Sequence, residues 1–255
     1  MCITAASAHL TSTKILSFQK ENGEVFLAYQ NEVMNESGKN AMILPIPGKI
    51  KTLYDTSKYN TFLDTITLRT KISEEYNYGV LSGRGGMTRG MSKSLSIEQK
   101  KVGMYNIVYS ALMTDLEEVC KLEDVKITPE LLSFFNTHYK NFGFICCLFS
   151  SKYKMSAQPI AFDYEPINKE HIFFPTMDSH DGSAPKHTSV RLDHKISTLM
   201  NEGKLIEGEK DYPDFLKNKM FGTYDLHFSD DNGDLYFNLN QKKAPNLKRQ
   251  FKVIK

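Results

Sequence analysis

A chain of 255 residues in which 40% are apolar and 24% are charged has the composition of a folded globular protein, which excludes intrinsic disorder. Its 32 basic and 30 acidic residues leave a net charge of +2, too small for general binding to nucleic acid or to an anionic membrane. No segment approaches the ~18 apolar residues of a membrane helix, and the N-terminus lacks the regions of a secretory signal. The four cysteines show no metal-ligand spacing, so we expect a protein of the reducing cytoplasm.

The first 48 residues predict short β-strands. Apolar residues favour strands over 2–6, 14–18 and 25–30, and Asn22-Gly23 favours a turn because both residues tolerate positive φ. The run Ala-Met-Ile-Leu-Pro-Ile-Pro-Gly at 41–48 predicts a buried strand. That strand ends at its prolines, since proline cannot donate to a central ladder.

Two segments predict helices. Apolar residues recur at i, i+3, i+4 and i+7 from Tyr59 to Ile66, with Thr56 or Ser57 as the N-cap. Thr-Pro-Glu at 128–130 supplies an N-cap, a proline at the first helical position and an early acid, and an apolar face follows it. Between these helices, residues 82–93 predict a glycine-rich basic loop without a phosphate-binding motif, and strands are expected over 94–98 and 105–112.

The C-terminal half predicts further strands, over residues 144–149, 157–162, 172–176 and 189–196. The last of these is expected to pass into a helix, because Leu192, Ile196, Leu199 and Met200 share one helical face before Gly203. A short helix is predicted over 213–220. Residues 229–233 then predict a β-hairpin, since Ser-Asp-Asp-Asn-Gly separates two short apolar runs.

Together these elements predict one α+β domain over residues 1–240, built of mainly antiparallel sheet with two principal helices packed on one face. Residues 25–48 and 144–166 share an order of apolar strand, polar connection, apolar strand and proline stop. This shared pattern fits a duplicated hairpin as well as two unrelated hairpins. Residues 241–255 form a basic tail without an acid, which is the one segment that could bind nucleic acid or another polyanion.

A cysteine near the start, AMILPIPG at 41–48 and the later IAFDYEP and IFFPTMDSHDG segments carry a resemblance. In this order the motifs resemble an uncharacterised bacterial family of unknown function, whose members have a Leu-Pro-x-Pro strand after an N-terminal cysteine segment. The resemblance covers about the first 50 residues and residues 142–182. It implies no activity and transfers no catalytic residue.

The densest polar chemistry lies between His171 and His194, which contains four of the seven histidines. Asp178 and His180 are two residues apart and share one side of a strand, and a turn at Gly182 can bring later histidines back beside them. Imidazole and carboxylate are ligands that divalent transition metals accept. The candidate metal ligands are His180, Asp181, His187 and His194. The alternative is a polar turn whose side chains cap backbone groups and face water.

Cys2 offers a separate hypothesis, because removal of Met1 would expose a terminal thiol with its own amine as base. The alternative is a buried small apolar side chain. Two function classes therefore stay open. The first is a non-catalytic binding or assembly protein for a protein or small-molecule ligand. The second is a metal-dependent hydrolase centred on His180.

Overall fold

The computed structural model describes residues 2–36, 38–71, 98–186, 188, 190–205, 213–229, 232–239 and 251–253. The predicted glycine-rich loop at 82–93, His187 and most of the basic tail lie outside these residues. Within the described chain, no helix is both long enough and apolar enough to cross a membrane. The predicted class, α+β with mainly antiparallel sheet, is confirmed.

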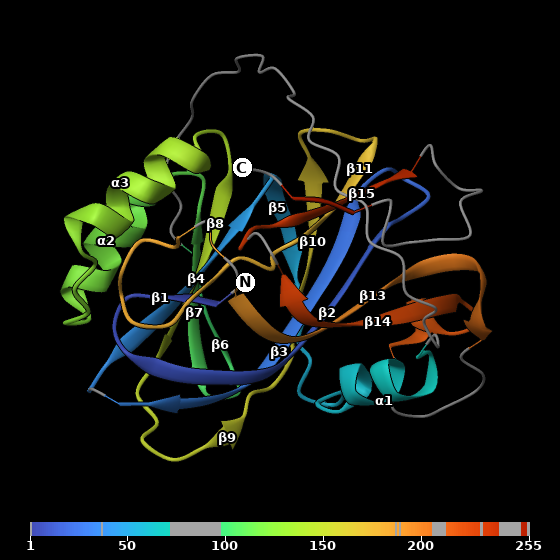
Figure 1. Ribbon diagram of the computed structural model, residues 1–255, viewed down its shortest axis with the longest axis horizontal. Helices are drawn as coiled ribbons and strands as arrows, with labels where there is room; N and C mark the ends of the chain where they lie inside the picture. Colours follow the sequence, from blue (N-terminus) through green and yellow to red (C-terminus); the bar gives the residue numbers. More distant parts are fainter. Residues whose placement is uncertain are drawn as a thin grey trace.

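A six-stranded sheet forms one layer of the molecule (Figure 1). Its strands pair antiparallel except β1 and β12, which run parallel. In spatial order they are β12 (Asp178–Ser179), β1 (Cys2–Thr4), β4 (Asn40–Ile46), β8 (Gly143–Phe149), β7 (Tyr105–Ser110) and β6 (Glu98–Val102).

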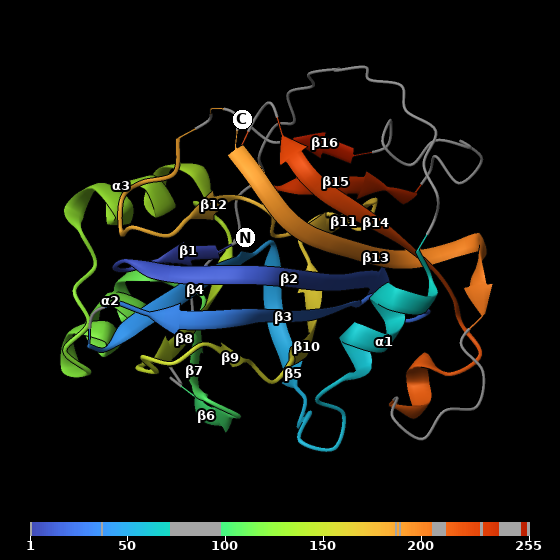
Figure 2. The same cartoon turned by 60° about the horizontal axis from the view of Figure 1, so that its bottom comes forward.

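A seven-stranded sheet forms the facing layer, and Figure 2 shows its long central strands side by side. In spatial order its strands are β14 (Met220–Ser229), β13 (Val190–Leu205), β2 (Ala8–Gln19), β3 (Val25–Asn35), β10 (Ile160–Pro166) and β5 (Gly48–Leu53), with β9 (Met155–Ser156) paired to β3. A small third sheet contains β11 (His171–Phe174), β15 (Leu235–Asn238) and β16 (Phe251–Val253). The described part of the tail therefore contributes a strand.

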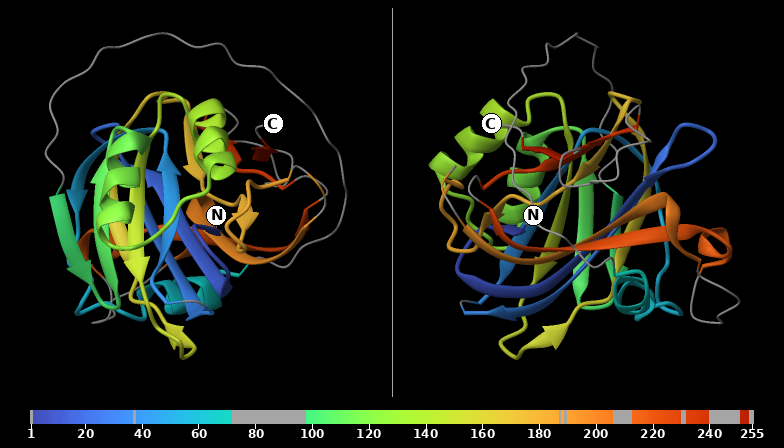
Figure 3. Two further views of the ribbon diagram at one scale, coloured as in Figure 1. Left: turned by 90° about the vertical axis from the view of Figure 1, so that its left-hand side faces the viewer. Right: turned by 45° about the vertical axis from the view of Figure 1, so that its right-hand side comes forward.

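The main hydrophobic core lies between the two large sheets. Strand alternation explains the division: on β4, Met42 and Leu44 enter this core, whereas Ala41 and Ile43 enter a second cluster on the opposite face. Helices α2 (Met113–Leu122) and α3 (Pro129–His138) cover that second cluster (Figure 3). Helix α1 (Phe62–Arg69) covers a third cluster on the outer face of the seven-stranded sheet. The result is a β-sandwich with helices on both outer faces.

Of the two predicted helices, α3 begins with the predicted N-cap and α1 does not. Thr128 caps α3 by accepting a hydrogen bond from Leu131 N at 3.2 Å, as predicted. Helix α1 begins at Phe62 after Thr61, which makes no side-chain cap, so the predicted caps at Thr56 and Ser57 are wrong. The arrangement of two principal helices on one face is not confirmed, because α1 packs on the other side and α2 was not predicted.

Three predictions for paired or helical segments are corrected by the sheet topology. The expected helix after residue 196 is wrong, since β13 continues as a strand to Leu205 and pairs with β14. The expected hairpin around residues 229–233 is wrong, because β14 pairs with β13 whereas β15 pairs with β11 and β16. The predicted short helix at 213–220 is a single 3-10 turn over Asp214–Leu216.

The two segments with a shared sequence pattern pair with each other instead of forming hairpins. Residues 25–48 place β3 in the seven-stranded sheet and β4 in the six-stranded sheet. Residues 144–166 run the other way, from β8 to β10. Strand β4 pairs with β8, and β3 pairs with β10, both antiparallel. Each segment therefore crosses the sandwich, and the two together join its layers.

Candidate functional site

The polar cluster that the sequence singles out lies beside the first strand of the chain. Strand β12 runs parallel to β1, with Cys2 opposite Asp178 and Ile3 opposite Ser179. The carbonyl of His180 accepts a hydrogen bond from Ala8 N at 2.9 Å. The chain then turns at Gly182, which has φ of +79°, and a β-carbon there would lie 2.6 Å from Ala5 O. Glycine is required at this turn because the backbone of the first strand passes so close.

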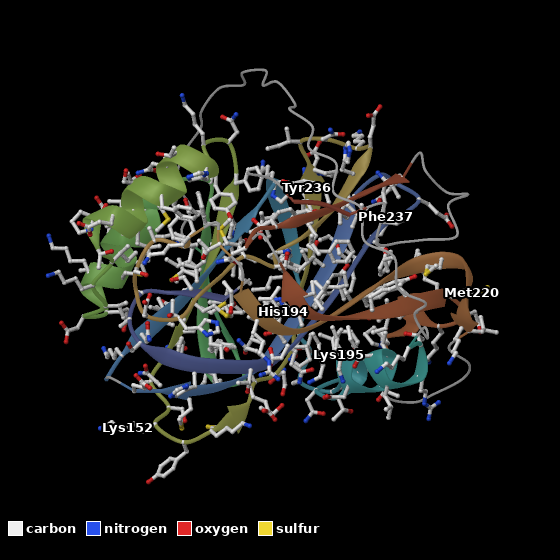
Figure 4. The ribbon with its side chains drawn as sticks, viewed as in Figure 1. Lys152, His194, Lys195, Met220, Tyr236 and Phe237 are labelled. Carbon is white, nitrogen blue, oxygen red and sulfur yellow. The ribbon has the colours of Figure 1, made fainter. Side chains whose placement is uncertain are left out.

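Asp178 stands between two histidines. Its Oδ1 lies 2.9 Å from His180 Nε2 and 3.8 Å from Nε2 of His194, which comes from β13. Asn232 fixes the backbone at this point, because its Oδ1 accepts from Asp178 N at 2.8 Å and its Nδ2 donates to Asp178 O at 2.7 Å. We call Asp178, His180 and His194 the His–Asp cluster; Figure 4 shows His194 in the interior of the molecule.

Burial sets the charges of the cluster. Desolvation on its own would raise the pKa of Asp178, but the hydrogen bond and charge of His180 outweigh it and hold that pKa below its usual value. Burial lowers the pKa of His194 to about 3. His194 is therefore neutral near pH 7, and its Nδ1 is buried without a hydrogen-bond partner among the described residues. Only His180, whose side chain is 27% exposed, is open to solvent.

A second buried carboxylate lies behind the cluster. Asp234 Oδ1 accepts hydrogen bonds from Thr176 N at 2.9 Å and Met177 N at 3.0 Å, and Asp234 Oδ2 accepts from Tyr139 Oη at 2.7 Å. Burial raises the pKa of Asp234 and that of Tyr139. These contacts fasten the segment before β15 to the end of α3 and to the connection between β11 and β12. Sequence reasoning missed both residues, since neither belongs to a local motif.

The structure places the predicted ligands in different surroundings. His180 and His194 approach the same carboxylate oxygen. Asp181 is exposed and is bound within its own turn, where Oδ1 accepts from Ser183 N at 2.9 Å, while His187 lies outside the described residues. In the described ranges, no group of three or more His, Cys, Asp or Glu side chains is placed to hold a metal ion. Metal binding by the predicted set stays a prediction.

Two buried thiols, those of Cys146 and Cys147, are poor nucleophiles. The Sγ atoms of Cys120 and Cys146 lie 3.6 Å apart, and this contact together with burial raises the pKa of Cys146 well above its ordinary value. Burial also raises the pKa of Cys147. Because the thiolate is the reactive form, these side chains are held inert.

The contacts of the His–Asp cluster and of Asp234 have a structural role. They hold β12, β13 and the segment before β15 together through buried polar groups.

Comparison with known proteins shows a likeness in structure. No family model and no curated protein sequence matches the chain. Among solved structures, that of baculovirus P35 is 13% identical, covers 97% of this chain and 98% of its own, and has a TM-score of 0.53. A mutated baculovirus P35 after caspase cleavage is 12% identical over 90% of this chain, with a TM-score of 0.48. The caspase-8/P35 complex is 12% identical over 91%, with a TM-score of 0.40. At such identity the first likeness establishes a shared fold alone.

Proposed function

We propose that this chain is a non-catalytic binding protein whose partner is a protease of the caspase type. The observation that carries the proposal is the fold likeness to baculovirus P35, which extends over nearly the whole length of both chains. P35 itself occurs in a solved complex with caspase-8 and in a form solved after caspase cleavage.

Two features of the described chain support binding over catalysis. The thiols of Cys146 and Cys147 have raised pKa values and are fully buried. Asp178 contacts His180 and is fixed by Asn232, and Asp234 accepts hydrogen bonds from the backbone. Such a site stabilises a fold, whereas a catalytic site needs a poised nucleophile or base facing its substrate. A cytoplasmic location, which the cysteine usage favours, belongs to the same proposal.

The proposal is tested by titrating purified full-length protein against a panel of active caspases that includes caspase-8. Residual hydrolysis of a fluorogenic peptide substrate is the readout, and papain, a cysteine protease of another class, is the control. We expect saturable loss of activity for at least one caspase and unchanged papain activity. Unchanged hydrolysis across the whole caspase panel at micromolar protein would overturn the proposal.

A further inference from the structure

The connection from β8 through β9 projects from one end of the sandwich (Figures 1 and 3). We call residues 150–156 the Tyr153 loop. It carries two large apolar side chains in the open, Tyr153 at 82% and Met155 at 44% exposure. Single exposed apolar residues are normal on a protein surface, but here two lie within three residues of one projecting loop. We call this pair of side chains the apolar tip.

The loop is held in place although its tip is exposed. Asn35 N donates to Ser151 O at 2.8 Å, and Tyr153 N donates to Ser151 Oγ at 3.3 Å. Lys154 Nζ lies 2.8 Å from Glu32 Oε2, and β9 pairs antiparallel with the end of β3. A loop fixed by its own contacts loses little further conformational entropy when a partner binds. The apolar tip is thus presented ready for contact.

The tip is flanked by two lysines, of which Lys154 pairs with Glu32. Lys152 lies at the projecting end (Figure 4) and pairs with no described acid. The turn between β6 and β7 packs against the chain just beyond the loop, since a β-carbon on Gly103 would lie 2.7 Å from Cβ of Gln158. Lys101, on β6, is exposed beside that turn. A partner that meets this end of the molecule is therefore favoured if its own surface is acidic.

We infer that the Tyr153 loop is a docking surface for an acidic face of the protein partner. Tyr153 and Met155 enter an apolar pocket of the partner, and Lys152 faces carboxylates at the rim of that pocket. Tyrosine and methionine are enriched where protein interfaces are buried, and one such anchor can dominate the affinity. The inference rests on the proposed binding of a caspase-type protease, to which it adds a second contact.

Four variants test the inference by their dissociation constants for the caspase that the unaltered chain binds, measured at low and at high salt. Tyr153→Ser is paired with Leu122→Ser, which removes a leucine that is 86% exposed on α2. Lys152→Glu is paired with Lys126→Glu, a charge reversal in the exposed connection before α3. We expect Tyr153→Ser to weaken binding by about tenfold or more. Lys152→Glu should weaken it about threefold at low salt and less at high salt, because salt screens exposed charges. Both controls should stay within twofold.

The outcomes separate the two proposals. If the unaltered chain binds a caspase and Tyr153→Ser binds within twofold of it, the docking surface is refuted and the proposed function stands. If the unaltered chain binds no caspase, both are refuted. Sedimentation of the chain alone and binding to phosphatidylserine vesicles test two other occupants. If Tyr153→Ser abolishes self-association or vesicle binding but not caspase binding, the loop serves that occupant and the inference is wrong.

Discussion

The His–Asp cluster and the Tyr153 loop each reverse the usual distribution of residues. The first places a carboxylate and the imidazole of His194 inside the protein, and the second places a tyrosine and a methionine outside it. The costs differ in kind. Buried polar groups must find partners within the fold, since water is not there to satisfy them. An exposed apolar tip costs the folded chain little, and its apolar surface is removed from water only when a partner covers it.

The two regions should therefore respond differently to substitution. Every carboxylate oxygen of Asp234 and the backbone around Asp178 are engaged inside the chain, so changes there should act on stability. The side chain of Tyr153 projects into solvent, so changes there should act on binding and leave stability intact. Three predictions sharpen this contrast.

The largest effect is expected from Asp234→Ala. This change leaves two backbone N–H groups and the Tyr139 hydroxyl buried without their acceptor, at about 1–3 kcal/mol for each unsatisfied group. We expect a loss of about 3–5 kcal/mol in the free energy of unfolding, measured with urea. Asp234→Asn, which keeps one acceptor oxygen, should lose less. Glu117→Ala, an exposed change on α2, is the control and should stay within about 0.5 kcal/mol. A loss as small as the control's would mean that the carboxylate does not fasten the fold.

An intermediate effect is expected in the pH dependence of stability. Burial lowers the pKa of His194 from its ordinary value of 6.5 to about 3 in the folded protein. On acidification, the imidazole therefore takes up its proton at a higher pH in the unfolded chain than in the folded protein. This contribution to stability is complete above about pH 6.5 and is lost as the pH falls toward 3, with a slope of up to about 1.4 kcal/mol per pH unit. His194→Gln should flatten the slope of unfolding free energy between pH 4.5 and 6.5.

The charges of Asp178 and His180 both act on His194, and both residues remain in the His194→Gln variant. The lowered pKa of Asp178 adds stability that is lost only below its ordinary value of 3.8, outside the measured range. The raised pKa of Asp234 acts in the opposite direction, and equally in both proteins. An unchanged slope in His194→Gln would show that the imidazole is not held neutral by burial.

The smallest effect on stability is expected from Tyr153→Ser. Because the side chain is 82% exposed, its removal should change the free energy of unfolding by less than about 0.5 kcal/mol. Thermal and urea unfolding both measure this. A loss above about 1 kcal/mol would show that the tyrosine supports the fold, and would end the contrast with the buried cluster.

The parts of the fold that could be predicted from sequence were those encoded locally. The start of α3 could be predicted from Thr128 and Pro129 alone, because both residues act within one helical turn. The second half of β13 could not be read in this way, because its apolar spacing fits a helix as well as a strand. Pairing with residues of β14, which lie 15 to 24 positions further along the chain, decides for the strand. Long-range pairing overrode local periodicity.

In the candidate site, too, only the contact between residues close in sequence could be predicted. The spacing of Asp178 and His180 was sufficient to place their side chains together, and they form a hydrogen bond. The approach of His194 depends on the path of β13. Asp234 and Tyr139 could not be foreseen, because they meet only when α3 and the segment before β15 pack against each other. The apolar tip at Tyr153 was also missed, since a single tyrosine in a polar connection carries no signal of exposure.

The most direct test of the account is size-exclusion chromatography with light scattering on a mixture of the full-length protein and caspase-8. We predict a single peak whose mass equals the sum of one or more copies of each protein, with Tyr153→Ser shifting material back to the separate peaks. Two separate peaks at micromolar concentrations of the unaltered proteins, with this and every other caspase tried, would contradict the proposal that the chain binds a caspase-type protease.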